Sequence, residues 1–477
     1  MRRSHRFLVL ALIPLVCGSA WAQRPARQQI DPQIASAVRD VSPARVKATI
    51  EKLVSFGTRN SLSSNDPEMA KQGKGVVAAR EWIKSEFERY SQACGGCLEV
   101  QYDQWTQEPG RRVPQPTDMA NVYAVLRGTD ALQARRIYLV TGHYDSMPSS
   151  PTDPKTNAPG ANDDASGTAV SLECARVLSK KKVPATIIFL TVVGEEQGLL
   201  GAAHFAKMAK EQGWQIEGVL NNDIVGGVKA PGQDPSIVRV FSEGVPAAAT
   251  EEQVRMIRNL GGESDSASRQ LARYVREVAK KYLAKTDFGP KLVFRRDRYL
   301  RGGDHTAFNE QGFAAVRFTE YREEYSHQHQ DPRTENGIEY GDLPKYVDFE
   351  YVANVARLNA ATLASLASAP PPPEKVTLLA EKLENDTSLV WEPSTGATSY
   401  EVLWRPTTAA EWENVEQAGN ATQATLKRSK DNVVFAVRAV DKQGHRSLPV
   451  VPTPKIGSAL PRPQQPAAAE KKPEEKK

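Results

Sequence analysis

Between about Pro43 and Leu366, short apolar runs rich in β-branched residues alternate with stretches of helical composition. Residues 164–180, for example, read as a crossover helix that ends before three lysines and a proline. Strands that alternate with helices in this way predict an α/β domain with a mostly parallel, mixed sheet. The predicted strands are residues 136–140, 186–193, 219–222 and 314–319.

A run of four prolines, Pro370–Pro373, marks a second boundary, because polyproline is a stiff spacer that cannot continue a helix. The pattern then changes to short alternating strands, which predict a small all-β sandwich over residues 375–456 behind a linker at 369–374. Trp391, Tyr400, Trp404 and the run 433–441 resemble a fibronectin type III domain. The expected strands are residues 388–391, 400–405, 423–427 and 433–441.

The two ends of the chain differ in composition from the rest. Residues 1–22 have three arginines, a short apolar run and the small-residue sequence Ala20-Trp21-Ala22, which is the order of a secretory signal peptide. Residues 23–42 are polar and predict a loose lead-in to a domain at 43–368. Residues 457–477 are rich in Pro, Ala, Glu and Lys and predict a disordered tail. We therefore expect an exported protein, periplasmic or secreted, with no stable membrane insertion once the signal is removed.

The net charge of +5 gives no support to a nucleic-acid partner. Three of the positive charges belong to the signal, so the exported chain carries only +2. Three cysteines remain in that chain, and Cys94 and Cys97 are spaced for a small-loop disulfide in an oxidising compartment. A thioredoxin-like redox pair is the alternative, but the surroundings suit a helix-to-strand turn rather than a strand-to-helix one. Cys174 lies in an apolar helical run and is expected to be a buried thiol.

Acidic residues and histidines cluster just after the predicted strands, where open parallel sheets build their binding sites. A neutral imidazole is a good zinc ligand, and a nearby carboxylate can fix its tautomer. Each cluster also has a plain structural explanation, since an acidic pair can cap a helix and a histidine can simply pack. A cap needs only one carboxylate of the pair, however. The clusters contain His143 and Asp145, Asp163 and Asp164, Glu195 and Glu196, Asp223, Asp304 and His305, and His327 and His329.

Together these residues resemble the co-catalytic dizinc aminopeptidases, a family that includes bacterial leucyl aminopeptidases and shares the three-layer fold of zinc exopeptidases. The resemblance covers about Asn121 to Asp331 and rests on motifs that occur in the family's order. It also implies that residues 121–124 form the edge strand that opens the fold. The motifs are His-x-Asp at 143, Asn-Asp-Asp-x-Ser-Gly at 162, Gly-Glu-Glu-x-Gly-Leu-x-Gly at 194, Asp223 after a strand, and His-x3-Asp at 327.

The resemblance implies two zinc ions per chain, with peptides as substrates. His143 and Asp223 are implied ligands of one zinc, Glu196 and His327 of the other, and Asp163 bridges them. Glu195 is the implied general base, and Asp145 the carboxylate that holds the His143 ring. His327 is preferred to His329 because the family's last ligand usually sits four residues before an aspartate.

One feature departs from the family's pattern. In several relatives a tyrosine immediately precedes the last ligand and helps to stabilise the oxyanion. Here Ser326 precedes His327 and Tyr325 lies one residue earlier, so the position of that tyrosine is taken by a serine.

This residue set predicts amide hydrolysis through a hydroxide that bridges two metals, with Glu195 passing its proton to the leaving amine. Histidine and carboxylate ligands suit zinc but also permit manganese or cobalt. The leading interpretation is an exported aminopeptidase.

Three other interpretations stay open. A carboxypeptidase or dipeptidase on the same scaffold could clamp a substrate carboxylate with an arginine of the group Arg295, Arg296, Arg298 and Arg301. A single-zinc glutaminyl cyclase is disfavoured because all five ligand positions are filled. A non-catalytic scaffold that presents the β-domain to a polymer or a cell surface is disfavoured for the same reason. Side-chain specificity and oligomeric state do not follow from the sequence.

Overall fold

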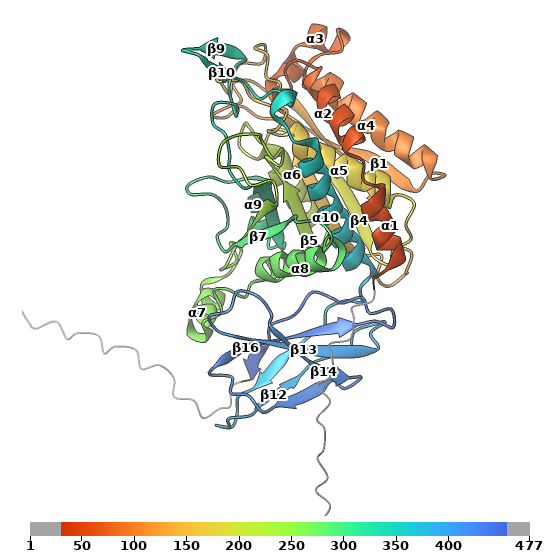
Figure 1. Cartoon of the computed structure of the whole chain (residues 1–477), viewed down its shortest axis with the longest axis vertical. Coiled ribbons are helices and arrows are strands. Elements are labelled where there is room, and N and C mark those ends of the chain that lie inside the picture. Colours follow the sequence, from red (N-terminus) through yellow and green to blue (C-terminus); the bar gives the residue numbers. More distant parts are fainter. Residues whose placement is uncertain (1–29, 456–477) are drawn as a thin grey trace, which may run out of the picture.

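The computed structural model describes residues 30–455 of the chain (Figure 1). The expected signal peptide at 1–22 and the expected tail at 457–477 lie outside the described residues. Within them, the larger part is an α/β unit and the smaller part is a β-sandwich joined to it by the proline segment. No helix among residues 30–455 combines the length and the apolar character needed to cross a membrane.

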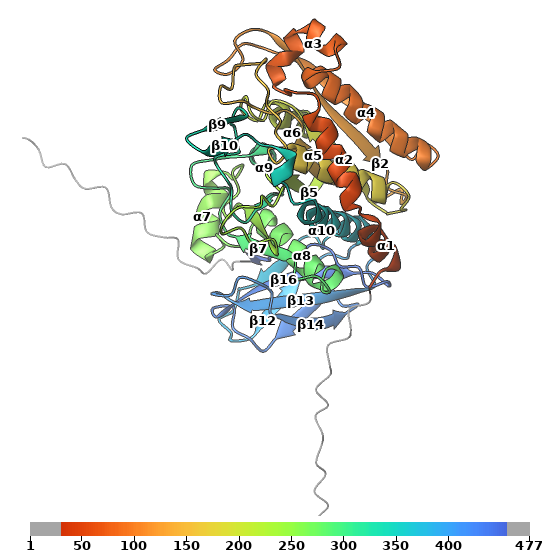
Figure 2. The same cartoon turned by 45° about the horizontal axis from the view of Figure 1, so that its top comes forward.

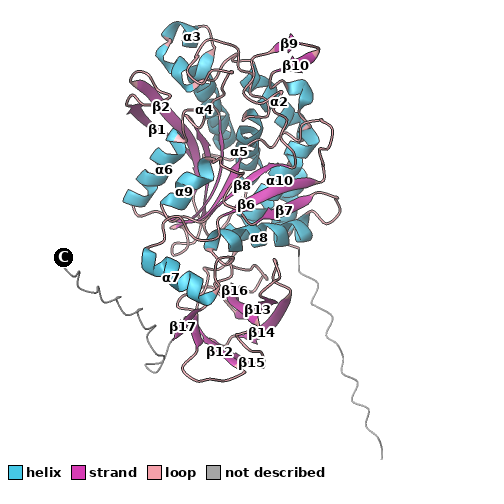
Figure 3. Ribbon diagram, turned by 90° about the vertical axis from the view of Figure 1, so that its left-hand side faces the viewer, coloured by secondary structure: helices cyan, strands magenta, loops and turns pink. Residues whose placement is uncertain are grey.

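An eight-stranded mixed sheet forms the centre of the α/β unit (Figure 3). The strands β4, β3, β5 and β8 are parallel to one another, and β7 is parallel to β6, while β1, β2 and β6 join antiparallel. The predicted mostly parallel mixed sheet is therefore confirmed. In order across the sheet the strands are β1 (Leu98–Gln107), β2 (Thr117–Leu126), β4 (Thr186–Val192), β3 (Arg136–His143), β5 (Gln215–Asn222), β8 (Ala315–Glu320), β6 (Ile237–Ser242) and β7 (Gly289–Val293).

Helices cover both faces of this sheet, which explains why its central strands are continuous apolar runs. In β4, Ile187 and Phe189 belong to the core on one face, and Ile188 and Leu190 to the core on the other. The first face is covered by α2 (Pro43–Val54), α4 (Gly75–Ala93), α5 (Ala165–Leu178), α8 (Ala267–Tyr282) and α10 (Phe349–Ser368), and the second by α6 (Leu200–Glu211) and α9 (Asp304–Glu310).

Two expectations about the start of the unit are wrong. The strand around residues 121–124 is not at the edge, because β1 pairs with β2 along its whole length and takes the edge position. Residues 32–40 are not a loose lead-in but form the helix α1 (Pro32–Asp40). Asp31 caps it by accepting hydrogen bonds from two backbone amides, and Ile34 and Ala37 are buried beneath it. The mostly polar sequence gives little sign of this helix, because only two of its side chains are fully buried.

The cysteine predictions are confirmed. Cys94 and Cys97 form a disulfide at the turn from α4 to β1, and Cys174 is a buried free thiol on α5. The shorter elements of the α/β unit are η1 (Ser61–Asn65), α3 (Pro67–Lys71), α7 (Glu251–Leu260), β9 (Arg333–Glu335), β10 (Ile338–Tyr340) and η2 (Pro344–Tyr346).

The C-terminal strands form two facing sheets around a core that includes Trp391, Tyr400 and Phe435, so the small sandwich is confirmed. Its finer resemblance to fibronectin type III stays a prediction. Arg136, the first residue of β3, donates to the Ala369 carbonyl at the start of the linker (2.9 Å), which places the sandwich toward the amino ends of the parallel strands (Figure 2). One sheet holds β15 (Gln423–Leu426), β12 (Thr387–Val390), β11 (Thr377–Leu379) and β17 (Thr453–Lys455), and the other β14 (Asn414–Gly419), β13 (Ser399–Pro406) and β16 (Val433–Val440).

Candidate metal centre

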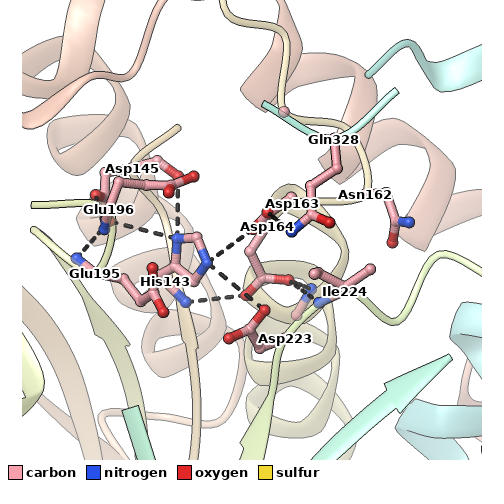
Figure 4. A network of polar contacts seen from close by, with 12 residues as sticks. His143, Asp145, Asn162, Asp163, Asp164, Glu195, Glu196, Asp223, Ile224 and Gln328 are labelled. Atoms are coloured by element: carbon pink, nitrogen blue, oxygen red, sulfur yellow. Dashed lines mark hydrogen bonds and ion pairs between the residues drawn. The ribbon is translucent and has the colours of Figure 1, made fainter. Parts of the chain in front are cut away.

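Most of the predicted site residues meet at the carboxyl ends of the parallel strands, at the far end of the sheet from the sandwich (Figure 4). His143 is the last residue of β3, and Asp223 directly follows β5. Glu195 and Glu196 follow β4, and Asp163 precedes the helix α5. The crossover connections of the sheet therefore bring side chains from four segments to one edge.

The His143 ring lies at the centre of this group. Its Nε2 is 3.0 Å from Oδ1 of Asp163 and 3.9 Å from Oδ1 of Asp223. Its Nδ1 is 3.2 Å from the carbonyl oxygen of Asp145 and 3.5 Å from Oδ1 of the same residue. The ring is thus fixed through Nδ1 while Nε2 faces the carboxylates, which is the orientation that a metal-binding imidazole needs.

Asp163 and Asp164 divide the two tasks that the sequence left open. Asp164 caps α5 by accepting from the Gly167 amide (2.9 Å), and it also accepts from the backbone amides of His143 (3.0 Å) and Ile224 (3.3 Å). It therefore ties three segments of the site together through their backbones. Asp163 points its carboxylate at the histidines instead.

The second histidine of the site is His329, and the expectation that His327 takes this place is wrong. Nε2 of His329 lies 2.9 Å from Oδ2 of Asp163 and 3.1 Å from Oε2 of Glu196. His327 instead stacks on the ring of Tyr346 at 3.8 Å between centroids. Asp331, the aspartate on which the prediction of His327 rests, bonds to Ser149 instead.

The residue that precedes the site histidine is consequently Gln328 rather than Ser326. Its side-chain amide donates to Oδ2 of Asp163 at 2.9 Å. Tyr325 is 65% exposed, and Ser326 bonds to Glu324. Neither occupies the place from which a tyrosine would stabilise an oxyanion.

Asp145 positions other groups. Its carboxylate accepts from the hydroxyl of Ser61 (3.1 Å) and from the backbone amides of Glu195 (3.4 Å) and Glu196 (3.3 Å). It thus holds both the His143 ring and the turn that carries the two glutamates. We describe it as a positioning residue.

Carboxylates outnumber cationic groups in this buried cluster. Burial raises the pKa of Glu195 well above its usual value, and the nearby Asp223 and Glu196 add to the shift. Burial alone would raise the pKa of Asp163 and lower those of the histidines. Charged partners outweigh burial: His143 and His329 hold the pKa of Asp163 well below its usual value, and Asp145 and Asp163 hold that of His143 well above its usual value. Glu196 and Asp163 raise the pKa of His329 to about 11.

This donor set fits divalent cations. The cluster contains two groups of three ligand atoms that lie within 4.8 Å of one another, His143 with Asp163 and Glu196, and His143 with Glu195 and Asp223. Oε1 of Glu196 and Oδ2 of Asp223 are buried and have no hydrogen-bond partner among the described residues. Buried unpaired carboxylate oxygens are costly unless a cation neutralises them.

Three further residues support the cluster and were not predicted as site residues. Arg317 donates to Oδ1 of Asp223 (2.8 Å). Asp342 accepts from the backbone amides of Asn162 (2.9 Å) and Asp163 (2.7 Å). Asp304 is fully buried beside the site, and burial raises its pKa to about 8. Arg317 and Asp342 stand in no motif, whereas the sequence Gly303-Asp304-His305 was noticed but given no role.

The comparisons with known proteins agree with this geometry. The family model for peptidase family M28 matches residues 121–346. A probable zinc metalloprotease of Leptosphaeria maculans is 43% identical over 90% of this chain and 98% of its own, and one of Pyrenophora teres f. teres is 43% identical over 90% and 88%. The aminopeptidase LapA of Legionella pneumophila has a similar fold, with a TM-score of 0.50, 18% identity and coverage of 77% of this chain and 80% of its own. The chain therefore belongs to peptidase family M28.

Proposed function

We propose that this peptidase is an exported dizinc aminopeptidase. The observation that carries the proposal is the position of Asp163, whose two carboxylate oxygens each contact a different histidine, Oδ1 with His143 and Oδ2 with His329. A carboxylate shared in this way is the arrangement needed to bridge two metal ions.

The chain's own residues divide into two ligand sets around this bridge. His143 and Asp223 would hold one zinc, and Glu196 and His329 the other. When bound, two zinc ions polarise a scissile carbonyl and lower the pKa of water. All five groups are histidines or carboxylates, which zinc accepts.

Glu195 is the proposed general base. It lies beside Glu196 but accepts no hydrogen bond that would fix its carboxylate elsewhere among the described residues, and it lines the pocket above the site. A carboxylate in this place can take a proton from water and return it to the leaving amine. Asp145 holds the backbone of this residue in place.

Two of the four arginines that a carboxypeptidase or dipeptidase could use to clamp a substrate carboxylate do not line the pocket, which favours an aminopeptidase. Of the arginines that a carboxypeptidase or dipeptidase could use, Arg295 lies over the ring of Tyr299 and Arg296 bonds to Glu310. Neither lines the pocket, whereas Arg298 and Arg301 do.

The test is the variant Glu195→Gln, assayed on an aminoacyl amide and on the same compound with a blocked amine. We expect kcat on the free-amine substrate to fall by about 10²–10⁴-fold with two zinc ions still bound, since only the proton acceptor is lost. The exposed Glu211 on α6 supplies the matched control, Glu211→Gln. Retained turnover in Glu195→Gln, or equal hydrolysis of the blocked compound by the parent protein, would count against the proposal.

Export is proposed from the N-terminal sequence and is supported by the disulfide, which persists in oxidising compartments. Expression with the native N-terminus, followed by N-terminal sequencing of the secreted or periplasmic product, should give a chain that begins at Gln23. A product that stays inside the cell with Met1 intact would contradict export.

A further inference from the structure

The pocket above the metal centre combines an acidic floor with a rim of arginines. Its floor is formed by the carboxylates of the site, and Leu199 and Ile224 are its aliphatic lining residues. No Phe, Tyr or Trp of residues 30–455 lines it. Three arginines also line it, Arg112, Arg298 and Arg301. The pocket is therefore poorly suited to a large apolar side chain and well suited to a charged group.

The positive charge of the rim is only partly compensated. Oε2 of Glu323 accepts from Arg298 (2.9 Å) and Arg301 (2.7 Å), and its Oε1 accepts from Arg239 (3.1 Å). One buried carboxylate thus serves three guanidinium groups. A second carboxylate, that of Asp297, is shared by Arg298 and Arg317. The arginines outnumber the carboxylates that they contact.

Arg301 is the most exposed of the three arginines that contact Glu323. Its side chain is 34% exposed, against 20% for Arg239 and 9% for Arg298. Only its Nη1 has a protein acceptor among the described residues. Nε and Nη2 are therefore free to donate to a ligand.

Arg112 approaches from another segment, the connection between β1 and β2. Its Nη1 donates to the backbone carbonyl of Glu196 at 2.6 Å, which anchors the side chain beside the metal centre. It has no carboxylate partner within 4 Å in the described part of the chain, and its remaining donors have no protein acceptor there. Arg112 thus brings a second guanidinium group with free donors to the same pocket.

We infer that Arg112 and Arg301 form a carboxylate-binding subsite for the part of the peptide that follows the scissile bond. Guanidinium groups pair well with carboxylates because their planar donors match both oxygens. The carboxylate is either the acidic side chain of the second residue or the free C-terminus of a dipeptide. The inference rests on the proposed function and adds a substrate class to it: acidic or very short peptides.

The test compares kcat/KM within two matched pairs of substrates. Ala-Glu-amide against Ala-Gln-amide isolates a side-chain carboxylate, and Ala-Gly against Ala-Gly-amide isolates a C-terminal one. We expect the zinc-loaded protein to prefer the carboxylate member of at least one pair by about tenfold or more, since charge-assisted hydrogen bonds are worth that factor. In Arg112→Gln/Arg301→Gln the ratio should fall to near one.

Two sets of variants complete the design. Arg111→Gln and Arg295→Gln remove exposed arginines that do not line the pocket, and both should keep the parent ratio. Arg112→Lys/Arg301→Lys keeps the charges but not the planar donors, and should give an intermediate ratio even if the glutamine variants fold poorly.

The outcomes separate the two proposals. The subsite would be overturned if kcat/KM were equal within both substrate pairs, or if both double variants kept the parent's preference unchanged. In either case, hydrolysis of Ala-Gln-amide would still support the peptidase. Failure to hydrolyse any of the four peptides would overturn the proposed function and the subsite with it.

Discussion

The two ends of the central sheet both bury charge, but they treat it in opposite ways. At the carboxyl ends of the strands, Glu195 is crowded by other carboxylates, and its pKa is raised well above the usual value by burial. At the other end, where the sandwich packs against α8, Glu401 is bound by Arg438 and Arg446. Burial also acts on Glu401, but Arg438 outweighs it and lowers the pKa to about 2.

Carboxylates are also paired with arginines across the interface between the α/β unit and the sandwich. Asp265 on the α/β side accepts from Arg273 (3.3 Å) and from Arg405 of the sandwich (2.6 Å), and Arg438 donates to Glu277 of α8 (2.7 Å). Buried carboxylates that are paired by the protein's own arginines hold two parts of the chain together. Buried carboxylates that the protein leaves unpaired are suited to a cation from outside.

The largest effect is expected from the two neighbouring histidines. His329→Ala removes an imidazole from the cluster and should reduce peptidase activity by at least about 100-fold, because the site loses a metal ligand. His327→Ala removes only a ring stacked on Tyr346 and should keep activity within a few-fold. Kinetics on both variants at fixed zinc concentration measure the difference. Equal losses in the two variants would show that the site histidine is misassigned.

At the interface, Arg438→Ala should lower the free energy of unfolding by about 3–5 kcal/mol, because Glu401 and Glu277 both lose a buried partner. Zinc content and kcat/KM of the folded fraction should not change, since the interface lies at the far end of the sheet. Denaturant unfolding measures the stability, and Arg428→Ala, which removes an exposed arginine of the sandwich, is the control. A loss of zinc in Arg438→Ala would mean that the two ends are not independent.

The smallest effect is expected at His445, whose ring lies 2.8 Å from Asp441 and 2.8 Å from Asp31, the cap of α1. Burial lowers the pKa of His445, but the two aspartates outweigh it and raise the pKa, while the pKa values of both aspartates are lowered. The stability that comes from the raised pKa of His445 is fully present below about pH 6.5, and it is lost as the pH rises through the pKa of His445 in the folded protein. The stability that comes from the lowered pKa values of Asp31 and Asp441 is present above about pH 3.8, and it is lost as the pH falls through their pKa values in the folded protein.

His445→Gln should therefore destabilise the protein by about 1 kcal/mol between roughly pH 4 and 6.5, and by less at pH 9. Thermal unfolding of the variant and the parent across this pH range measures the difference. A gap between the two proteins that widens toward pH 9 would reverse the expected sign.

The fold and most of the site could be predicted because their signals are local. The β-branched run 186–193 can only be a buried strand, and the position of a parallel strand's end fixes where Glu195 and Glu196 must lie. Asp223 follows from the same rule. These residues are placed by the sheet itself, so sequence order was enough.

The features that the sequence did not predict depend on how the loops run in three dimensions rather than on the order of residues along the chain. His327 and His329 differ by two positions in one loop, and which ring enters the site is decided by a turn in which His329 has a φ of +54°. Asp342 reaches Asp163 across 179 positions and carries no motif of its own. The helix α1 is similarly hidden, because its burial comes from the α/β unit rather than from its own polar sequence.

The central claim, that buried carboxylates and two histidines hold two zinc ions around Asp163, is tested most directly by counting the metal. Protein stripped with a chelator and reloaded with zinc should bind two ions per chain by elemental analysis, and His329→Ala should bind about one. A parent protein that saturates at a single zinc, or at none, would contradict the account.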